Sequence, residues 1–305
     1  MNNLNRIQFE KPNLEILTKN HTVVDLHFHT RFSDGINKVK TVVKKAIELG
    51  IGVAVTDHND IRGAIAINEY RNLLTIPGIE ITSAEGSHLL VYFYYIDELI
   101  KFYQKDIQPF MGNDVMTSLS LSMEEIIHRA HCYHVIIILA HPYCAAYTGV
   151  CNLQFPPERL KGLCDTVDGV EVINAGNINK WNLKCALFGF NLNKAIVGGS
   201  DGHSINEMGR AVTYSDCKPN RRDFLDAIKQ GHNKVIGKEI DFIKKITSNS
   251  LKLRSNLRNC PDLIGKNVKY GRVVINSKSK LLVESFKRHF NARAKKYAER
   301  EFLGF

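Results

Sequence analysis

Residues 23–30, VVDLHFHT, decide the fold: an apolar, β-branched run that leads into two histidines. Val23–Phe28 has the composition of a strand, in which alternate side chains point to the same side. His27 and His29 are therefore expected to point to the same side of the strand and to bind one cation. Asp25 lies two residues earlier, where its carboxylate is placed to orient an imidazole from behind. The stretch predicts a metal site at the end of a strand.

Six further fragments put a metal-binding residue type beside a turn or a strand end. They are SDG (33–35), TDHN (56–59), PGIE (77–80), GSHLL (86–90), AHPY (140–143) and GGSDGHS (198–204). Each fragment alone has an ordinary structural explanation, such as turn formation by Asp34. His141 precedes a proline, which favours an extended conformation. Together the fragments supply nine candidate ligands, enough for two or three metal ions: His27, His29, Asp34, His58, Glu80, His88, His141, Asp201 and His203.

From Thr22 onward, short β-rich runs alternate with helical patterns. We expect strands at 23–28, 53–56, 79–82, 89–95, 135–140, 170–174 and 195–199, and helices at 37–49, 61–72, 122–133, 180–189 and 220–231. Such alternation indicates parallel βαβ units. In an α/β barrel the carboxyl ends of the strands converge on one rim, so ligands far apart in sequence share a pocket. Glu171 and Asn174 end a strand at the same rim, with a purely structural role as the alternative.

The charge of the chain is concentrated at one end. The whole chain of 305 residues carries a formal net charge of +10, but residues 238–305 alone hold 17 Lys+Arg against 6 Asp+Glu. The preceding 237 residues hold 24 against 25. We therefore divide the chain into a lead-in at 1–20, a near-neutral barrel at 21–237 and a basic extension at 238–305, partly helical over 280–302.

Composition also limits the cellular setting. Apolar content is 44% and charged content 24%, as in ordinary globular proteins. The longest apolar runs, such as Val135–Ala140, are far too short to cross a bilayer. The first residues have no apolar core of a secretory signal. Seven scattered cysteines without a CxxC pair are typical of reduced thiols, so we expect a cytoplasmic protein.

Together the fragments resemble the PHP (polymerase and histidinol phosphatase) domain family over about residues 21–237. The four signature blocks of the family match DLHFHT, TDHN, AHPY and SDGHS in family order, and SDG, PGIE and GSHLL fall where the family places intervening ligands. The resemblance implies an α/β fold, a distorted (β/α)7 barrel of the PHP type, with a trinuclear metal site. The chain is too short for a polymerase that carries a PHP module, which leaves the free-standing phosphoesterase branch.

The resemblance also implies how the ligands divide among the metals. The first metal would be held by His27, His29, Glu80 and Asp201, the second by Glu80 as a bridge with His88 and His141, and the third by Asp34, His58 and His203. Some relatives carry histidine at the position of Asp34. Mixed imidazole and carboxylate ligation favours zinc, manganese or iron over magnesium and calcium, which prefer oxygen ligands.

We therefore expect a metal-dependent phosphoesterase that hydrolyses a small phosphorylated metabolite or a nucleotide with a metal-activated hydroxide. Asp201, His203 and Arg210 are the residues expected at the reacting phosphate. Arg210 is a candidate phosphate clamp because guanidinium binds phosphate in a bidentate manner. Arg62 is a second candidate of this kind. A surface salt bridge is the alternative for both arginines.

Three rival functions stay open. A 5'-3' exonuclease on short RNA or DNA would use the basic extension to gather polyanions; packing of the extension on the barrel, or binding of a partner protein, is the alternative for that segment. A nucleic-acid-binding protein with a purely structural barrel would have no reason to keep nine ligands. Amidohydrolase chemistry lacks the signal of a carboxylated lysine. No membrane partner is expected.

Overall fold

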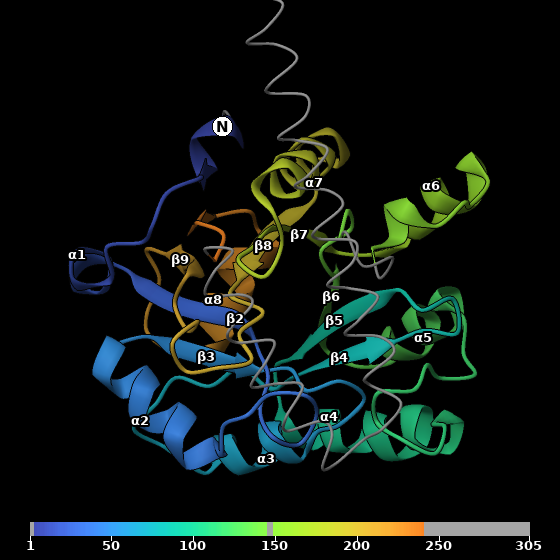
Figure 1. Cartoon of the computed structure of the whole chain (residues 1–305), viewed down its shortest axis with the longest axis horizontal. Coiled ribbons are helices and arrows are strands. Elements are labelled where there is room, and N and C mark those ends of the chain that lie inside the picture. Colours follow the sequence, from blue (N-terminus) through green and yellow to red (C-terminus); the bar gives the residue numbers. More distant parts are fainter. Residues whose placement is uncertain (1–2, 145–148, 241–305) are drawn as a thin grey trace, which may run out of the picture.

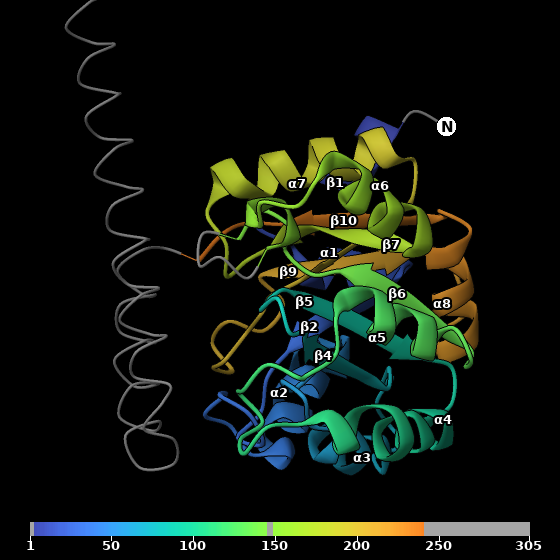
Figure 2. The same ribbon diagram turned by 90° about the vertical axis from the view of Figure 1, so that its right-hand side faces the viewer.

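The computed structural model describes residues 3–144 and 149–240. Figures 1 and 2 show the strands gathered at the centre and most of the helices outside them. The strands are β1 (Ile7–Gln8), β2 (Thr22–Phe28), β3 (Gly52–Val55), β4 (Gly78–Thr82), β5 (His88–Phe93), β6 (Val135–Leu139), β7 (Gly169–Asn174), β8 (Ala195–Gly199), β9 (Ala211–Ser215) and β10 (Asn233–Gly237). The α-helices are α1 (Leu14–Asn20), α2 (Val39–Leu49), α3 (Arg62–Asn68), α4 (Ile96–Phe102), α5 (Met123–Ala130), α6 (Pro157–Thr166), α7 (Asn179–Leu192) and α8 (Arg221–Lys229).

The fold is mixed α/β, as expected, but the strands form two sheets rather than one closed barrel. One sheet has the order β1-β10-β9-β2-β3 and the other β4-β5-β6-β7-β8. Parallel pairing holds for β2 with β3, β6 with β7 and β7 with β8. The expectation of parallel units throughout is wrong for the other major pairs, since β2–β9, β9–β10, β4–β5 and β5–β6 are antiparallel.

A short connection explains the antiparallel pair of β4 and β5. Only residues 83–87 separate the two strands, whereas a parallel crossover needs a dozen residues or more. Gly86 takes a left-handed φ of 81° in this turn, which a residue without Cβ adopts readily. The turn brings the start of β5 to the same edge as the end of β4, where Thr82 pairs with His88.

Both ends of the described chain add elements that periodicity did not reveal. The expected lead-in contains strand β1, which pairs with β10, and helix α1. The side chain of Asn13 caps the start of α1 by accepting a hydrogen bond from the backbone N–H of Ile16. Strands β9 and β10 were also not predicted. Residues 241–305, which hold most of the expected basic extension and its helix at 280–302, lie outside the described residues.

The apolar core has three parts. One cluster lies between the second sheet and helices α4, α5 and α6, and another lies against α2 on the first sheet. The third is inside the strands and joins Leu26 and Leu90 from the two sheets to Phe224 on α8. Helix α8 lies at one end of the strands in Figure 2. The interior is therefore filled by side chains from both sheets, as in a packed barrel. Among the described residues, no helix has the length and apolarity that crossing a membrane demands.

The close approach of β8 to β2 depends on Gly199, the last residue of β8. A Cβ built on Gly199 would lie 2.4 Å from the Cβ of His27 and 2.5 Å from its backbone nitrogen. No side chain fits at that distance, so the glycine fixes how near the two strands come. The candidate ligands on β2 and after β8 share a space because of this contact.

Gly199→Ala is expected to lower the free energy of unfolding by about 1–3 kcal/mol, because the methyl group must push the two strands apart. Chemical denaturation measures the change. Gly162→Ala is the matched control: Gly162 lies in α6, where an added Cβ would meet nothing within 4 Å. That substitution should leave stability unchanged or raise it by up to about 1 kcal/mol. Equal stability of Gly199→Ala and the wild type would contradict the proposed contact.

Candidate metal centre

The two sheets meet at the candidate ligands. On one side an isolated parallel bridge joins His58 to Glu80, with the N–H of Asn59 donating to the carbonyl of Glu80 at 2.9 Å. On the other side a second bridge joins Phe28 to Gly202, between the end of β2 and the segment after β8. The two bridges therefore join the sheets on either side of the candidate ligands.

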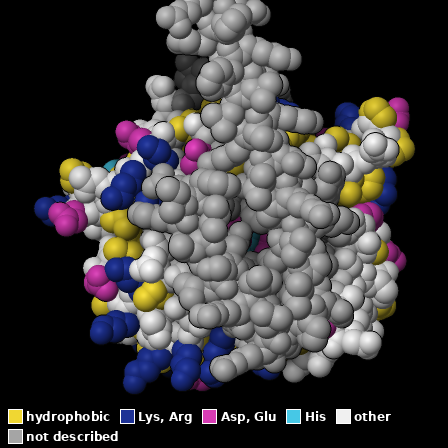
Figure 3. All heavy atoms as spheres, in the orientation of Figure 1, with side chains coloured by type: hydrophobic (Ala, Val, Ile, Leu, Met, Phe, Trp, Pro, Cys, Tyr) yellow, Lys and Arg dark blue, Asp and Glu magenta, His cyan; other side chains and the backbone are white. Residues whose placement is uncertain are grey.

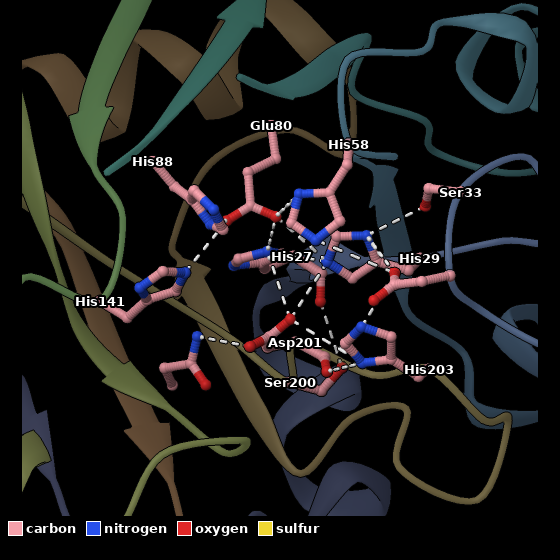
Figure 4. Close-up of polar contacts among 12 residues, drawn as sticks. His27, His29, Ser33, His58, Glu80, His88, His141, Ser200, Asp201 and His203 are labelled. Atoms are coloured by element: carbon pink, nitrogen blue, oxygen red, sulfur yellow. Dashed lines mark hydrogen bonds and ion pairs between the residues drawn. The ribbon is translucent and has the colours of Figure 1, made fainter. Parts of the chain in front are cut away.

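All nine residues named from the sequence lie around this point, and Figure 4 labels all of them except Asp34. Among the described residues, three groups offer ligand atoms within 4.8 Å of one another and could each hold a metal ion. The groups are His29, Asp34, His58 and His203; His27, His29 and Asp201; and His58, Glu80 and His88. Residues from separate strands and loops thus converge on one site.

The carboxylate of Glu80 is the centre of the arrangement. The residue is 1% exposed and sits in the middle of β4 rather than at its end. Five imidazole nitrogens surround its two oxygens: Oε2 lies 3.2 Å from His27 Nε2, 3.3 Å from His29 Nε2 and 3.1 Å from His58 Nδ1, and Oε1 lies 2.8 Å from His88 Nδ1 and 3.0 Å from His141 Nε2. A carboxylate so placed can bridge two cations.

The remaining candidate ligands lie on the other side of His29. The Nε2 atom of His29 is 3.1 Å from Asp201 Oδ1, and its ring stacks on that of His203 with centroids 4.5 Å apart. His203 Nε2 lies 3.1 Å from Asp34 Oδ1, and its Nδ1 donates to the carbonyl of Asp201 at 2.9 Å. The side chains of Asp201 and His203 are 22% and 16% exposed, so this side of the cluster is the more accessible.

The carboxylates of the cluster favour positive charge at His27. Burial opposes protonation of His27, but the carboxylates of Glu80, Glu171 and Asp201 outweigh it and raise its pKa well above the usual value. Burial also opposes ionisation of Glu80, yet the surrounding histidines hold its pKa well below the usual value. For His58, burial dominates and lowers the pKa, which keeps the imidazole neutral. Carboxylates that stabilise a proton here would also stabilise a metal cation.

The contacts between the side chains fit metal ligands better than a hydrogen-bond network. The Nε2 atoms of His27 and His29 lie 3.1 Å apart and also 3.2 and 3.3 Å from Glu80 Oε2, which is more contacts than one proton on each nitrogen satisfies well. Glu80 Oε2 and His58 Nδ1 are buried and 3.1 Å apart, yet neither makes a hydrogen bond. Buried polar groups rarely lack a hydrogen-bond partner. Ligand atoms that lie within 4.8 Å of one another, as in the three groups, are what a bound cation requires.

Two candidate ligands have strained backbones. Asp201 has a φ of 49° and His141 a φ of 27°, both in the left-handed region that disfavours side chains. The expectation that the following proline holds His141 extended is therefore wrong. Strain of this kind costs about 1–3 kcal/mol and persists only where the surroundings impose it. It is concentrated here because these two residues must turn out of strands β6 and β8 toward the cluster.

Asp25 does not orient an imidazole, contrary to expectation. Its buried carboxylate accepts backbone N–H groups from Ser200 at 2.8 Å and Gly209 at 2.9 Å, so it holds the segment that carries Asp201 and His203. Burial raises the pKa of Asp25 to about 6 despite these donors. The place of Asp25 in the sequence, two residues before His27, does not indicate that its partners are the distant backbone N–H groups of Ser200 and Gly209.

Asp57 was not singled out from the sequence, yet it is fully buried behind the site. Its carboxylate accepts the backbone N–H and hydroxyl of Thr30 at 2.7 and 2.6 Å, and the hydroxyl of Ser33 at 2.7 Å. These contacts fix the loop between His29 and Asp34. The signal available in the sequence was an acid directly before His58 at the end of an apolar strand.

The two candidate arginines occupy different settings. Arg210 is half-buried just before β9, and its backbone N–H donates to the carbonyl of Glu207. Arg62 begins α3, has a side chain 63% exposed and binds Asp60 through Nε at 2.8 Å. Its guanidinium also lies 4.9 Å from the centre of the Phe32 ring. Arg62 thus has the salt bridge that was its alternative explanation.

Comparison with known proteins places this site in a family. A model of the PHP domain matches residues 25–154, and one described as PHP-associated matches residues 180–233. An uncharacterized protein of Methanocaldococcus jannaschii is 29% identical over 166 residues, which are 50% of this chain and 81% of that protein. The 5'-3' exoribonuclease Rnm of Salmonella typhimurium is 37% identical over 76 residues, or 23% of this chain and 26% of the exoribonuclease.

Solved structures share the fold. The lesion-specific endonuclease PfuEndoQ of Pyrococcus furiosus superposes with a TM-score of 0.58 at 19% identity, over 70% of this chain and 57% of that one. The likeness is one of architecture, and this chain matches little more than half of the endonuclease. The two family models span the segments that carry the nine clustered residues, from the histidine pair to the region beyond Asp201. The chain belongs to the PHP domain family and is a hydrolytic enzyme.

Proposed function

We propose that this enzyme hydrolyses a phosphate ester at a centre of two or three divalent cations held by the nine clustered residues. The observation that carries the proposal is the buried carboxylate of Glu80 with five imidazole nitrogens within 3.3 Å. Imidazole and carboxylate ligands together favour zinc, manganese or iron. The division inferred from the family resemblance gives Glu80 the bridging position.

The cations would lower the pKa of water and neutralise the oxygens of the phosphate. The residues of the chain determine where the phosphate lies. Asp201 and His203 are the partly exposed members of the cluster, so a substrate approaches past them. Arg210 would bind a phosphate oxygen from the rim. Arg62 already binds Asp60 but keeps an exposed guanidinium for a second contact.

The leading substrate class is a small phosphorylated metabolite or a nucleotide. A short RNA or DNA cleaved from its 5' end is the second candidate, and two relatives support it because their names describe nucleases. A basic edge on the described barrel also favours it. Lys38, Lys40 and Lys44 lie on and before α2, and Figure 3 shows Lys and Arg side chains along this lower left edge. The basic segment 238–305 would add to this charge.

The domain division and the setting are part of the proposal. Residues 21–237 would form the catalytic unit, with β1 and β10 paired at its edge. The cysteines among the described residues are free thiols, which supports a reducing compartment such as the cytoplasm. The substrate is the expected partner.

Purified protein should contain two or three equivalents of transition metal by plasma mass spectrometry. His27→Ala and Asp201→Ala should lose metal and lower kcat/KM for a chromogenic phosphate ester by more than the ~100-fold typical of losing an outer contact. His128→Ala is the matched control, because His128 is exposed on α5 and lies outside the cluster. Metal content and activity that survive in the two cluster variants would refute the proposed centre.

The dependence of kcat/KM on salt concentration should differ between the two substrate classes. For a polyanion gathered by lysines, kcat/KM is expected to fall several-fold between roughly 50 and 200 mM salt, because counterions compete for the phosphates. For a small monoester the change should be slight. The measurement is the hydrolysis of short 5'-phosphorylated RNA and of a chromogenic monoester and diester by the full chain. A salt-independent rate on RNA would argue against the nuclease candidate.

A further inference from the structure

We propose that Glu171 is a positioning residue of the metal centre, which fixes the tautomer and orientation of His27 and the backbone at His141. The inference rests on the proposed function, since it assumes that His27 binds a cation. Glu171 lies on β7, between the strands that lead to His141 and to Asp201. Strand β7 supplies none of the residues in the three groups that could hold a metal.

The first contact determines which nitrogen of His27 faces the cluster. Glu171 Oε1 lies 2.9 Å from His27 Nδ1, and both side chains are 0% exposed. A carboxylate can only accept, so Nδ1 must carry the proton. The neutral imidazole then presents the lone pair of Nε2, which is the atom 3.2 Å from Glu80 Oε2. Without this contact the ring is free to adopt the other tautomer, whose Nε2–H cannot bind a cation.

The second contact holds a strained backbone. Glu171 Oε2 accepts the backbone N–H of His141 at 2.9 Å. His141 has a φ of 27°, a conformation that needs support from its surroundings. The carboxylate therefore restrains two ligands at once, one through its ring and one through its main chain. These ligands come from different sheets, so the contact also joins the sheets.

Asn174 extends the same network to a third ligand. Its amide Nδ2 donates to Glu171 Oε2 at 3.1 Å and lies 3.2 Å from Asp201 Oδ2. Its own backbone is held by the side chain of Asn182 on α7, through contacts of 3.2 and 2.9 Å. The packing of α7 on β7 is thereby connected to the carboxylates of the site.

Glu171 is a positioning residue rather than a ligand because its oxygens are already occupied. Burying a carboxylate is costly unless donors surround it. The imidazole N–H of His27, the backbone N–H of His141 and the amide of Asn174 meet that need. All three donors would be abandoned if the carboxylate turned to a cation.

The test compares Glu171→Gln with the wild type as full chains stripped of metal and titrated with Co²⁺ and Zn²⁺ against a chelator. Glutamine has the same shape, but its NH2 group must face one of the donors. We expect metal affinity to fall 10- to 100-fold and the Co²⁺ absorption band to shift. Asp106→Asn is the matched control. Asp106 is also buried and accepts from Tyr133 at 2.7 Å and Arg129 at 3.3 Å, so that variant should lose stability and keep wild-type metal affinity.

A second measurement needs no variant. Nitrogen NMR of the Zn²⁺-loaded wild type should show the His27 ring protonated at Nδ1 and not at Nε2. A proton on Nε2, or wild-type metal affinity in Glu171→Gln, overturns the role of Glu171 and leaves the proposed function intact. A wild type that binds no metal overturns both. Weaker metal binding by Asp106→Asn to the same degree would show a general effect of destabilisation and also refute the specific role.

Discussion

The structure depends on one buried carboxylate surrounded by imidazoles. Glu80 is 1% exposed, and each of its oxygens faces at least two ring nitrogens. In water these groups would be solvated separately, and in the interior their polar atoms need partners. Protons can satisfy only some of the contacts, whereas cations would satisfy them together. The cluster is therefore a feature that the rest of the fold must stabilise until a metal binds.

Support comes from acids that lie behind the ligands. Asp25 holds the segment after β8 through backbone donors, Asp57 holds the loop after His29, and Glu171 holds His27 and His141. All three are buried, and each bonds to chain that is distant in sequence from itself. Such contacts limit the movement of the ligands, so the site is preorganised by the same interactions that join the two sheets. Metal binding and stability should consequently be coupled.

The sequence was informative where a local pattern carries the information. The apolar strands β2 and β6 and the amphipathic helices α2 and α8 were placed within a few residues, since periodicity reports which face is buried. Periodicity did not predict strands β9 and β10, and it did not predict that β5 runs antiparallel to β4 and β6. Strand direction depends on which neighbour completes the hydrogen bonds. The short connection at residues 83–87 is the local feature that indicates the antiparallel direction of β5.

By itself the sequence indicated the candidate chemistry: nine residues of types that bind cations, and the family whose motifs they match. The tertiary structure alone decided their partners. In the folded chain Asp25 accepts backbone N–H groups rather than orienting an imidazole, and His141 adopts a left-handed conformation. Glu171 contacts His27, which lies 144 residues away in the sequence. The reason is physical. Which residue can bind a metal follows from its own side chain, but which nitrogen it presents depends on a contact across the fold.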